Sequence, residues 1–306
     1  MTEPARPAIR LAPTTCAICG TLDNSDQLYP PTFGEASFNE QVFSARRAPD
    51  AIHYRIVRCR ACGLVRSDPA ADQASLSGLY ERSSLDYGAE IPNLRRTYGR
   101  YLERARRRSG GKSLLEIGCG NGFMLEEALA QGYESIRGVE PSREAIGAAA
   151  PAIRDRIAPG VMAPGQFTPG EFDTVCMFQV FDHLPEPGNI LDQVRTLLGA
   201  GGVLLCFNHN VESMSARLLG ERSPIIDIEH CFLYSPSTMR TILERHGFKV
   251  VECGPAINTV SIRHLVHLLP VTAALRPGLQ AAGSTRIGQL AVRLPLGNLY
   301  VVAVKS

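Results

Sequence analysis

Hydrophobic residues from position 112 onward occur in short runs that alternate with stretches of helical periodicity. The runs predict buried β-strands over residues 112–117, 135–140, 172–178, 203–207, 248–253 and 299–304, with a weaker strand around Ile157. The intervening stretches predict helices that begin at Phe123, after Pro141-Ser142, at Ile190 and at Pro236. Strands and helices that alternate in this way are typical of a parallel sheet covered by helices. The chain from 93 to 306 is therefore predicted to be one α/β domain.

Two further helical stretches border this pattern. Residues 93–108 carry apolar positions at helical spacing and end in an arginine-rich run, 104–108. We interpret the arginines as a solvated face whose charges suit a helix C-terminus, in preference to a nucleic-acid contact. An insertion, 254–297, separates the last two strands and holds an apolar stretch, 262–269. This stretch is interpreted as a core or dimer-contact helix, with a lid or a patch for a lipid-linked substrate as the alternative.

Three segments precede the α/β domain. Residues 1–13 offer little to bury and are predicted to be a mobile tail. Residues 14–68 hold two cysteine pairs and are predicted to form a small separate module. Residues 69–92 form a linker that contains Tyr80 and Tyr87. We interpret these tyrosines as surface aromatics, with a lid over a ligand as the sharper alternative.

Composition limits the partners and the cellular compartment expected for this protein. The chain has 306 residues, 44% of them hydrophobic, and a net charge of +2, which does not favour nucleic acid as a partner. Its first residues lack the apolar core of a signal peptide, and no run of about 18 apolar residues predicts a membrane span. Nine cysteines, mostly unpaired, suit a reducing cytoplasm better than a secreted disulfide scaffold. We expect a cytoplasmic monomer or homodimer.

The two cysteine pairs share the pattern C-x-x-C-G and provide four thiolates: Cys16, Cys19, Cys59 and Cys62. Each pair places two sulfurs on one tight turn, and four sulfurs are the ligand set of a structural, tetrahedral Zn²⁺. Free thiols and a redox pair are the alternatives, but a redox motif would occur once, beside a strand–helix unit. A site closed by four cysteines has no open position for catalysis, so its predicted role is to stabilise a segment too small to fold alone.

The stretch LLEIGCGNGF, residues 114–123, predicts a buried strand, a glycine-rich turn and the start of a helix. Its three glycines allow backbone N–H groups to approach a ligand: Gly118, Gly120 and Gly122. Acidic residues flank the turn, Glu116 before it and Glu140 after the next strand, which favours a ligand with amines and ribose hydroxyls. A nicotinamide site would have a third glycine where Phe123 stands, and a P-loop would continue with G-K-S/T.

Five motifs in order resemble the class I S-adenosylmethionine-dependent methyltransferases. They are EIGCGNG at 116–122, GVEPS at 138–142, FDTV through VFDHL at 172–184, LLGAGGVL at 197–204 and LERHGF at 243–248. The resemblance covers roughly residues 98–255 and the final strand. It implies a Rossmann-like seven-stranded sheet of order 3-2-1-4-5-7-6, with strand 7 antiparallel.

The resemblance also implies a cofactor site at the carboxyl ends of strands one, two and four. The matching residues are Glu116, Gly118, Cys119, Gly120, Gly122, Phe123, Glu140, Pro141, Val161, Met162 and Gln179. In this interpretation Glu140 accepts hydrogen bonds from the ribose hydroxyls, and Glu116 interacts with the methionine amino group. Gln179 is expected to lie near the methionine part or the sulfonium. The usual acid for the adenine amine is missing, so Val161 or Met162 is expected to contact the base.

A second resemblance concerns the acceptor. The cysteine module, the linker tyrosines and the Glu229-His230 pair are similar to features of the zinc-containing sugar C-methyltransferases. That similarity implies acceptor-facing roles for Tyr80, Tyr87, Glu229 and His230, with His230 as a base. Other candidates at strand ends or in loops are His183, Asn208, His209 and Asn210. The chain ends soon after strand seven and lacks the further C-terminal domain of those enzymes, so O-methylation of a small molecule is expected as readily as C-methylation.

Two other functions remain open from the sequence. An RNA methyltransferase is one, since some of these enzymes carry an N-terminal cysteine module, but the low net charge argues against it. A non-catalytic zinc-stabilised scaffold is the other, and the intact glycines and Glu140 argue against that. The preferred hypothesis is a methyltransferase that acts on a sugar or sugar-like metabolite.

Overall fold

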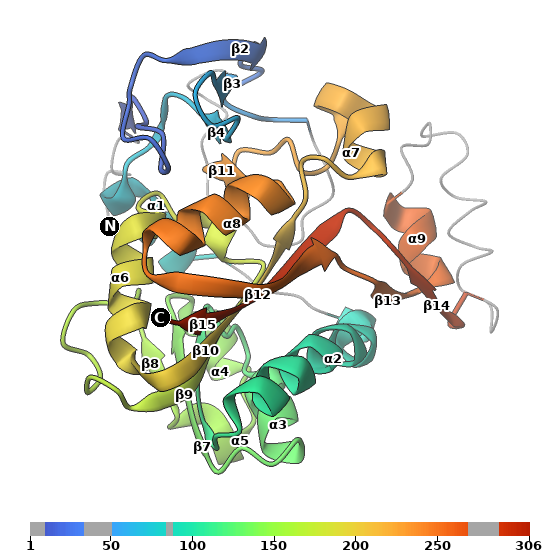
Figure 1. Cartoon of the computed structure of the whole chain (residues 1–306). Helices are drawn as coiled ribbons and strands as arrows, with labels where there is room; N and C mark the ends of the chain where they lie inside the picture. The colour runs from blue at the N-terminus through green and yellow to red at the C-terminus, as the bar shows by residue number, and fades with distance from the viewer. Residues whose placement is uncertain (1–9, 34–50, 84–87, 269–287) are drawn as a thin grey trace, which may run out of the picture.

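A seven-stranded sheet forms the centre of the computed structural model, which describes residues 10–33, 51–83, 88–268 and 288–306 (Figure 1). Its strand order is β12-β15-β10-β9-β6-β7-β8. The strands are β6 (Ser113–Ile117), β7 (Ser135–Glu140), β8 (Ile157–Pro159), β9 (Phe172–Phe178), β10 (Leu198–His209), β12 (Phe248–Pro255) and β15 (Asn298–Lys305). Only β15 runs antiparallel to its neighbours, β10 and β12. In chain order this is 3-2-1-4-5-7-6, so the predicted topology is confirmed.

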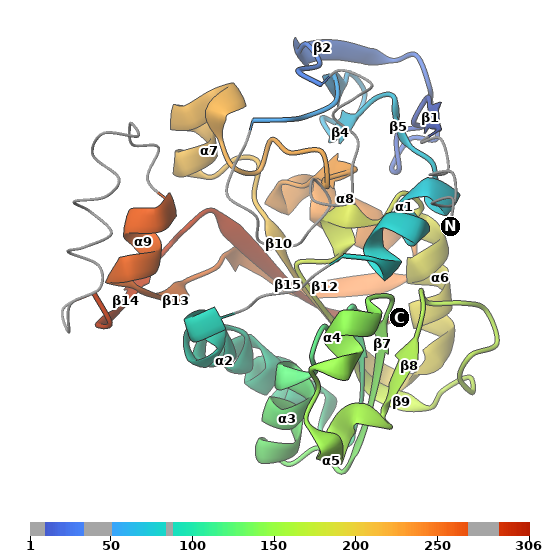
Figure 2. The same cartoon turned by 180° about the vertical axis from the view of Figure 1, so that it is seen from behind.

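Helices cover both faces of the sheet (Figures 1 and 2). On one face α2 (Ile91–Ser109) and α3 (Phe123–Ala130) pack over side chains such as Leu114. On the other face α6 (Pro187–Leu197) and α8 (Pro236–Arg245) pack over side chains such as Leu115. Successive strand residues point to opposite faces, so the apolar run of β6 supplies both cores. Two short helices, α4 (Arg143–Gly147) and α5 (Pro151–Arg154), connect β7 to β8.

The N-terminal module contributes to a second, antiparallel sheet of order β11-β4-β3-β2, and Cys59 is the last residue of β3. Three of its strands come from the N-terminal module: β2 (Ser25–Tyr29), β3 (Ile56–Cys59) and β4 (Val65–Ser67). The fourth, β11 (Phe232–Leu233), comes from the α/β domain and pairs with β4. The module predicted from the sequence over residues 14–68 therefore shares a sheet with β11, the strand that follows the segment containing His230.

The segments predicted to be a mobile tail and a linker contain strands and a helix. A two-residue strand, β1 (Leu11–Ala12), pairs with β5 (Ala70–Ala71), so the end of the tail lies against the start of the linker. The linker continues as α1 (Gln73–Glu81), whose N-cap Asp72 accepts a hydrogen bond from the Ser75 amide. A short turn of helix, η2 (Gly88–Glu90), leads into α2. Such short elements carry no periodic pattern that sequence could reveal.

The insertion contributes β13 (Asn258–Ser261), α9 (Ile262–Leu268) and β14 (Ala291–Leu294), and β13 pairs with β14. After β10 the chain forms α7 (Met214–Leu219) and η4 (Gly220–Arg222), which the sequence patterns did not indicate. Another single turn, η3 (Phe181–His183), follows β9. Among the helices in the described ranges, none is long and apolar enough to cross a membrane.

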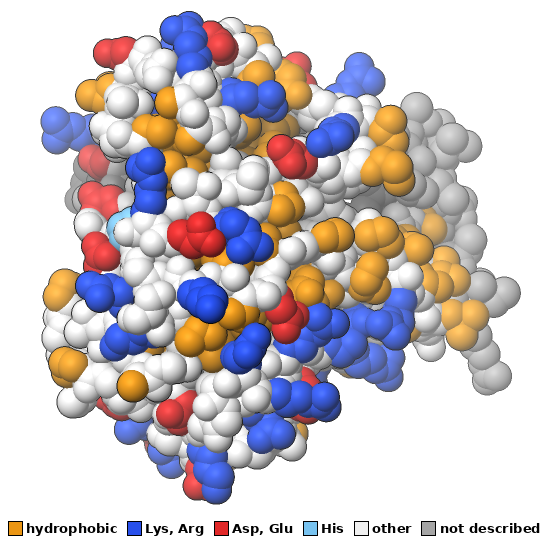
Figure 3. Space-filling view, in the orientation of Figure 1, with side chains coloured by type: hydrophobic (Ala, Val, Ile, Leu, Met, Phe, Trp, Pro, Cys, Tyr) orange, Lys and Arg blue, Asp and Glu red, His pale blue; other side chains and the backbone are white. Residues whose placement is uncertain are grey.

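Arginine side chains gather over α2 on the face shown in Figure 3. Several of them pair with carboxylates. Arg95 lies 2.6 Å from Glu126, Arg104 lies 2.9 Å from Glu252, and Arg107 lies 2.7 Å from the Glu103 one turn earlier. These exposed pairs contribute little individually, but they offset the charge of the helix. Such compensation is the arrangement expected of a solvated helix face.

Candidate cofactor and acceptor site

The glycine turn after β6 has a backbone that only glycine adopts at low cost. Gly118, Gly120 and Gly122 have φ values of 70°, 56° and 76°, all in the left-handed region. A Cβ on Gly118 would lie 2.5 Å from Cγ2 of Val180, and one on Gly122 would lie 2.4 Å from Cδ1 of Ile153. The turn therefore needs glycine both for its backbone angles and for the close approach of its neighbours.

The carboxylate of Glu140, at the end of β7, is bound to this turn. Its Oε2 accepts a hydrogen bond of 2.7 Å from the amide of Gly120, and its Oε1 accepts one of 2.8 Å from the amide of Ser142. Burial raises the pKa of Glu140, although both amides act in the opposite direction. The carboxylate is thus fixed at the junction of two strand ends, where further lone pairs remain for hydroxyl donors.

Two more polar side chains next to the turn have a buried oxygen without a hydrogen-bond partner. Glu116 is almost fully buried, and its Oε2 has no hydrogen-bond partner. Burial, and then the charge of Glu140, raise the pKa of Glu116 well above its ordinary value. Gln179 adopts a φ of 58°, and its backbone amide donates to the Phe207 carbonyl at 2.7 Å. Its side-chain Oε1 is buried without a hydrogen-bond partner. These oxygens fit a ligand that brings a cationic amine and hydroxyl donors, as S-adenosylmethionine does.

The remaining predicted cofactor residues lie around the same sheet edge. Cys119 and Phe123 are buried in the turn and at the start of α3, and Pro141 follows β7 directly. Val161 and Met162 follow β8, as predicted, and differ in exposure: Val161 is 45% exposed and Met162 is 8% exposed. Met162 is thus the better buried of the two predicted adenine contacts.

A cluster of three histidines surrounds one buried carboxylate beside this edge. Asp182 is fully buried in η3 and accepts a hydrogen bond of 2.8 Å from Nδ1 of His209, at the end of β10. Nε2 of His183 lies 3.8 Å from Asp182 Oδ1, and Nε2 of His230 lies 3.9 Å from Asp182 Oδ2. The rings of His183 and His209 each lie 4.7 Å from that of His230, between centroids. Ligand atoms of Asp182, His183 and His230 lie within 4.8 Å of one another, a spacing that would also admit a metal ion.

Burial and neighbouring charges set the protonation states of the Asp182 carboxylate and of the imidazoles around it. Burial alone would raise the pKa of Asp182, but the His209 hydrogen bond and the nearby imidazoles hold that pKa well below its ordinary range. Burial lowers the pKa of His183. Burial, together with the neighbouring imidazoles, lowers the pKa of His230 well below its ordinary value. At neutral pH the cluster therefore combines an ionised carboxylate with neutral His183 and His230.

The predicted acceptor residues that the structure describes converge on the cluster. Tyr80 of α1 places its hydroxyl 3.1 Å from Nδ1 of His183, and burial, then the charge of Glu229, raise its pKa well above the ordinary value. Glu229 and His230 are buried in the segment before β11. The α1 end also approaches the cofactor side, since the Ser142 hydroxyl donates to the carbonyl of Ser83 at 2.8 Å. Tyr87 lies outside the described residues.

Sequence reasoning did not identify Asp182 as the centre of this cluster. The Asp182 to His209 contact joins residues on either side of α6, and the Tyr80 to His183 contact joins residues from different segments. The one available signal was the motif FDHL after β9, which placed Asp182 and His183 at a strand end. Two other candidates are also buried: Asn208 near the end of β10 and Asn210 just after it.

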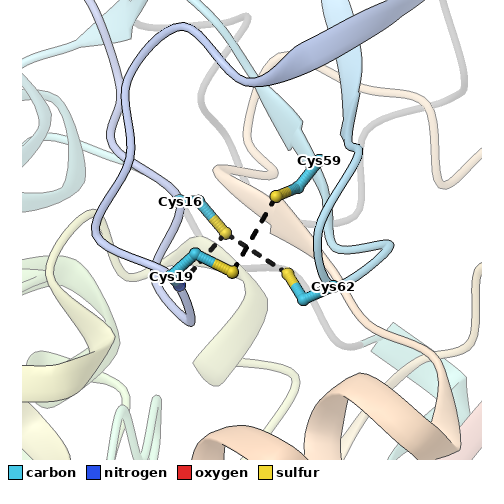
Figure 4. Close-up of side chains that lie close together, drawn as sticks. All are labelled: Cys16, Cys19, Cys59 and Cys62. Carbon is cyan, nitrogen blue, oxygen red and sulfur yellow. Dashed lines mark hydrogen bonds between the residues drawn. The ribbon is translucent and has the colours of Figure 1, made fainter.

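The four cysteines of the N-terminal module converge as predicted (Figure 4). The sulfurs of Cys16 and Cys62 lie 3.5 Å apart, those of Cys19 and Cys59 lie 4.0 Å apart, and all four cysteines are free thiols. A tetrahedral ion with Zn–S bonds of about 2.3 Å would space its sulfurs by roughly 3.8 Å. The sulfur positions therefore fit a zinc ion.

Comparisons with known proteins identify the family of this chain. A protein family described as "Methyltransferase domain" matches residues 91–253, more than half of the chain. Ubiquinone biosynthesis O-methyltransferase of Burkholderia pseudomallei is 26% identical over 155 residues, which span 46% of this chain and 66% of that protein. The enzyme of the same name from Paraburkholderia xenovorans is 31% identical over 120 residues, or 36% of this chain and 50% of that protein. The chain thus spans between half and about two thirds of these relatives' lengths.

Among solved structures, a putative methyltransferase of Bacillus halodurans C-125 superposes with a TM-score of 0.48 at 16% identity, covering 71% of this chain and 99% of that one. A Haemonchus contortus phosphoethanolamine N-methyltransferase complex with S-adenosylhomocysteine gives a TM-score of 0.43 at 16% identity, covering 68% and 53%. The family match extends from α2 through β12 and includes the glycine turn and both carboxylates beside it. The chain therefore belongs to the methyltransferase domain family.

Proposed function

We propose that this enzyme transfers the methyl group of S-adenosylmethionine to oxygen or carbon of a small acceptor, a sugar or sugar-like metabolite. The observation that supports this most directly is the buried cluster of Asp182 and three histidines at the ends of β9 and β10. Methylation of a hydroxyl or a carbon acid requires removal of a proton, and a neutral imidazole is a suitable acceptor for it.

The proposed cofactor pose follows from the buried oxygens around the turn. Glu140 accepts the two ribose hydroxyls, Glu116 faces the methionine amino group, and Gln179 faces the methionine chain. Met162 and Val161 contact the adenine from the β8 side. Cys119, Phe123 and Pro141 line the remaining surface next to the three glycines. When bound, the cofactor supplies an electrophilic methyl group on a sulfonium, and the chain supplies position and exclusion of water.

The proposed acceptor pose lies between α1 and the segment before β11. Tyr80, Glu229 and His230 contact the acceptor, and Tyr87 is expected to join them. His230 takes the proton of the reacting group, because its imidazole is neutral at physiological pH and so has a ring nitrogen that can accept a proton. Asp182, 3.9 Å from Nε2 of His230, then stabilises the imidazolium that forms.

A methyl-transfer assay with radiolabelled S-adenosylmethionine and a panel of keto-sugars, sugar nucleotides and phenolic or polyol metabolites tests this proposal. We expect turnover of at least one sugar-like acceptor, and a loss of at least about 100-fold in kcat for His230→Gln. His246→Gln is the matched control, since His246 also faces an aspartate, Asp192, but at the surface. RNA belongs in the panel. Methylation of RNA alone, or equal losses in both variants, would contradict the proposal.

We further propose that the four cysteines hold a structural zinc ion. The convergence of four free sulfurs at zinc-like spacing supports it, as does the shared sheet that ties this module to the α/β domain. Cys59→Ser should reduce bound zinc from one ion per chain to much less than one, measured by atomic absorption. The same variant should lower the midpoint of thermal unfolding, because metal binding contributes to folding. Cys253→Ser, outside the module, should change neither.

A further inference from the structure

The shortest hydrogen bond between side chains of the histidine cluster joins Asp182 and His209. The Nδ1 to Oδ2 distance is 2.8 Å, and the same oxygen also accepts the backbone amide of His209 at 3.3 Å. The carboxylate is fully buried, and its pKa is held low by this bond after the opposing effect of burial. An ionised carboxylate only accepts hydrogen bonds, so the proton between the two groups resides on Nδ1.

A neutral imidazole carries one ring proton. When His209 is neutral and that proton lies on Nδ1, its Nε2 has a bare lone pair and can only accept. A carboxylate uses the same arrangement to fix the tautomer and orientation of an imidazole in hydrolytic triads. Asp182 therefore decides which nitrogen of His209 is available to a ligand.

The available nitrogen belongs to a partly exposed side chain. His209 is the last residue of β10, and its side chain is 25% exposed, whereas Asp182 is buried behind it. Because Nδ1 faces Asp182, the opposite edge of the ring, with Nε2, points away from the buried carboxylate. No hydrogen bond or ion pair joins this Nε2 to any of the described residues. The ring stands edge-on to His230, with 4.7 Å between centroids.

We propose that Asp182 is a positioning residue that holds His209 as the Nδ1–H tautomer, so that Nε2 accepts a hydrogen bond from an acceptor hydroxyl adjacent to the methylated atom. His230 takes the proton of the reacting group, and His209 recognises its hydroxyl neighbour. The enzyme then selects acceptors with at least two polar groups on neighbouring atoms. This inference rests on the proposed function for the acceptor, but its tautomer component does not.

Nitrogen-15 NMR of histidine-labelled protein, with S-adenosylhomocysteine added, tests the tautomer. We expect His209, assigned by loss of its signals in His209→Gln, to show a protonated Nδ1 and a bare Nε2 at pH 7.5. Asp182→Asn should raise the fraction of the Nε2–H tautomer several-fold. Asp192→Asn, at the surface pair with His246, should leave His209 unchanged. A His209 found as the Nε2–H tautomer in the wild type would overturn the proposal even if Asp182→Asn misfolded.

Acceptor pairs that differ by one hydroxyl group beside the methylated atom test the recognition. When an acceptor lacks the hydroxyl group that a polar group of the site would bind, that polar group is left unpaired, and kcat/KM typically falls by about tenfold or more. We expect the wild type to prefer the hydroxylated member by that factor and His209→Phe to lose the preference. Equal turnover of both members by the wild type would refute the recognition. If nothing in the panel is methylated, the proposed function fails while the tautomer measurement still decides the role of Asp182.

Discussion

The hydroxyl of Ser67 connects the cysteine module to the backbone of the proposed acceptor site. Ser67, the last residue of β4, donates to the carbonyl of His230 at 2.7 Å, and its amide donates to the carbonyl of Cys231 at 3.0 Å. Both Ser67 and His230 are buried. Ser67→Ala removes only the first of these bonds, because the amide and the β4 to β11 pairing depend on the backbone.

The expected cost follows from burial. A typical intramolecular hydrogen bond contributes about 1 kcal/mol net, but a buried acceptor left without a donor costs about 1–3 kcal/mol. The carbonyl of His230 cannot reach bulk water without local rearrangement, so we expect the free energy of unfolding to fall by about 1–3 kcal/mol. A comparable free energy lost by local opening would speed amide exchange in residues 229–233 by roughly 5- to 150-fold.

Urea unfolding monitored by circular dichroism measures the first effect, and hydrogen exchange with mass spectrometry measures the second. Thr241→Ala is the matched control, since its hydroxyl donates to a backbone carbonyl, that of Ser237, at 2.9 Å on an exposed face of α8. The control should change the free energy of unfolding by less than about 0.5 kcal/mol. A Ser67→Ala effect no larger than that, with unchanged exchange at 229–233, would refute the coupling between module and site.

Two further predictions concern the turn and its buried acid. Gly118→Ala should weaken S-adenosylmethionine binding about tenfold or more, because an L-residue at φ 70° is strained by roughly 1 kcal/mol and its Cβ would lie 2.5 Å from Val180. Gly110→Ala, at φ 64° with nothing within 4 Å, should lose similar stability but keep its affinity, and equal affinity losses in both would contradict the prediction. For Glu116, burial and then Glu140 raise the folded pKa above the ordinary value of 4.5, so the unfolded chain releases the proton first and stability falls as pH rises from about 4.5 upward. Glu116→Gln should therefore raise the thermal midpoint of the ligand-free protein at pH 8, with a smaller gain near pH 5, while weakening cofactor binding. A pH-independent difference in scanning fluorimetry would show that the charge of Glu116 is not the cause.

The sheet and the cofactor turn could be predicted because their signals are local. A strand, a glycine turn and a helix occupy consecutive residues, and each strand buried on both faces is a near-continuous apolar run. The strand order was then predicted from the resemblance of these motifs to those of class I S-adenosylmethionine-dependent methyltransferases. Even the weak third strand was placed correctly around Ile157, and β10 differed only in extending beyond 203–207 to Leu198–His209.

The acceptor side was less predictable because its contacts are distant in sequence. The pairing of β4 with β11 involves two residues from β11, too few for an alternating pattern. The bond between Asp182 and His209 joins two strand ends across α6, and nothing in either local stretch specifies a partner. The end of the predicted tail pairs with β5 for the same reason: Leu11 and Ala12 have too little pattern to reveal a strand. The candidate residues could be identified from the sequence, but only the fold showed which of them lie together.

Titration calorimetry of S-adenosylmethionine with the wild type and Glu140→Ala is the most direct test of the proposed binding mode. If Glu140 accepts both ribose hydroxyls, its removal forfeits two hydrogen bonds to a charged group, about 1.5–3 kcal/mol each. We expect saturable binding with one site per chain in the wild type and affinity at least about 100-fold lower in Glu140→Ala. Glu134→Ala, an exposed acid near the start of the same strand, should bind as the wild type does. No binding by the wild type, or equal affinity in Glu140→Ala, would contradict this assignment of the cofactor site.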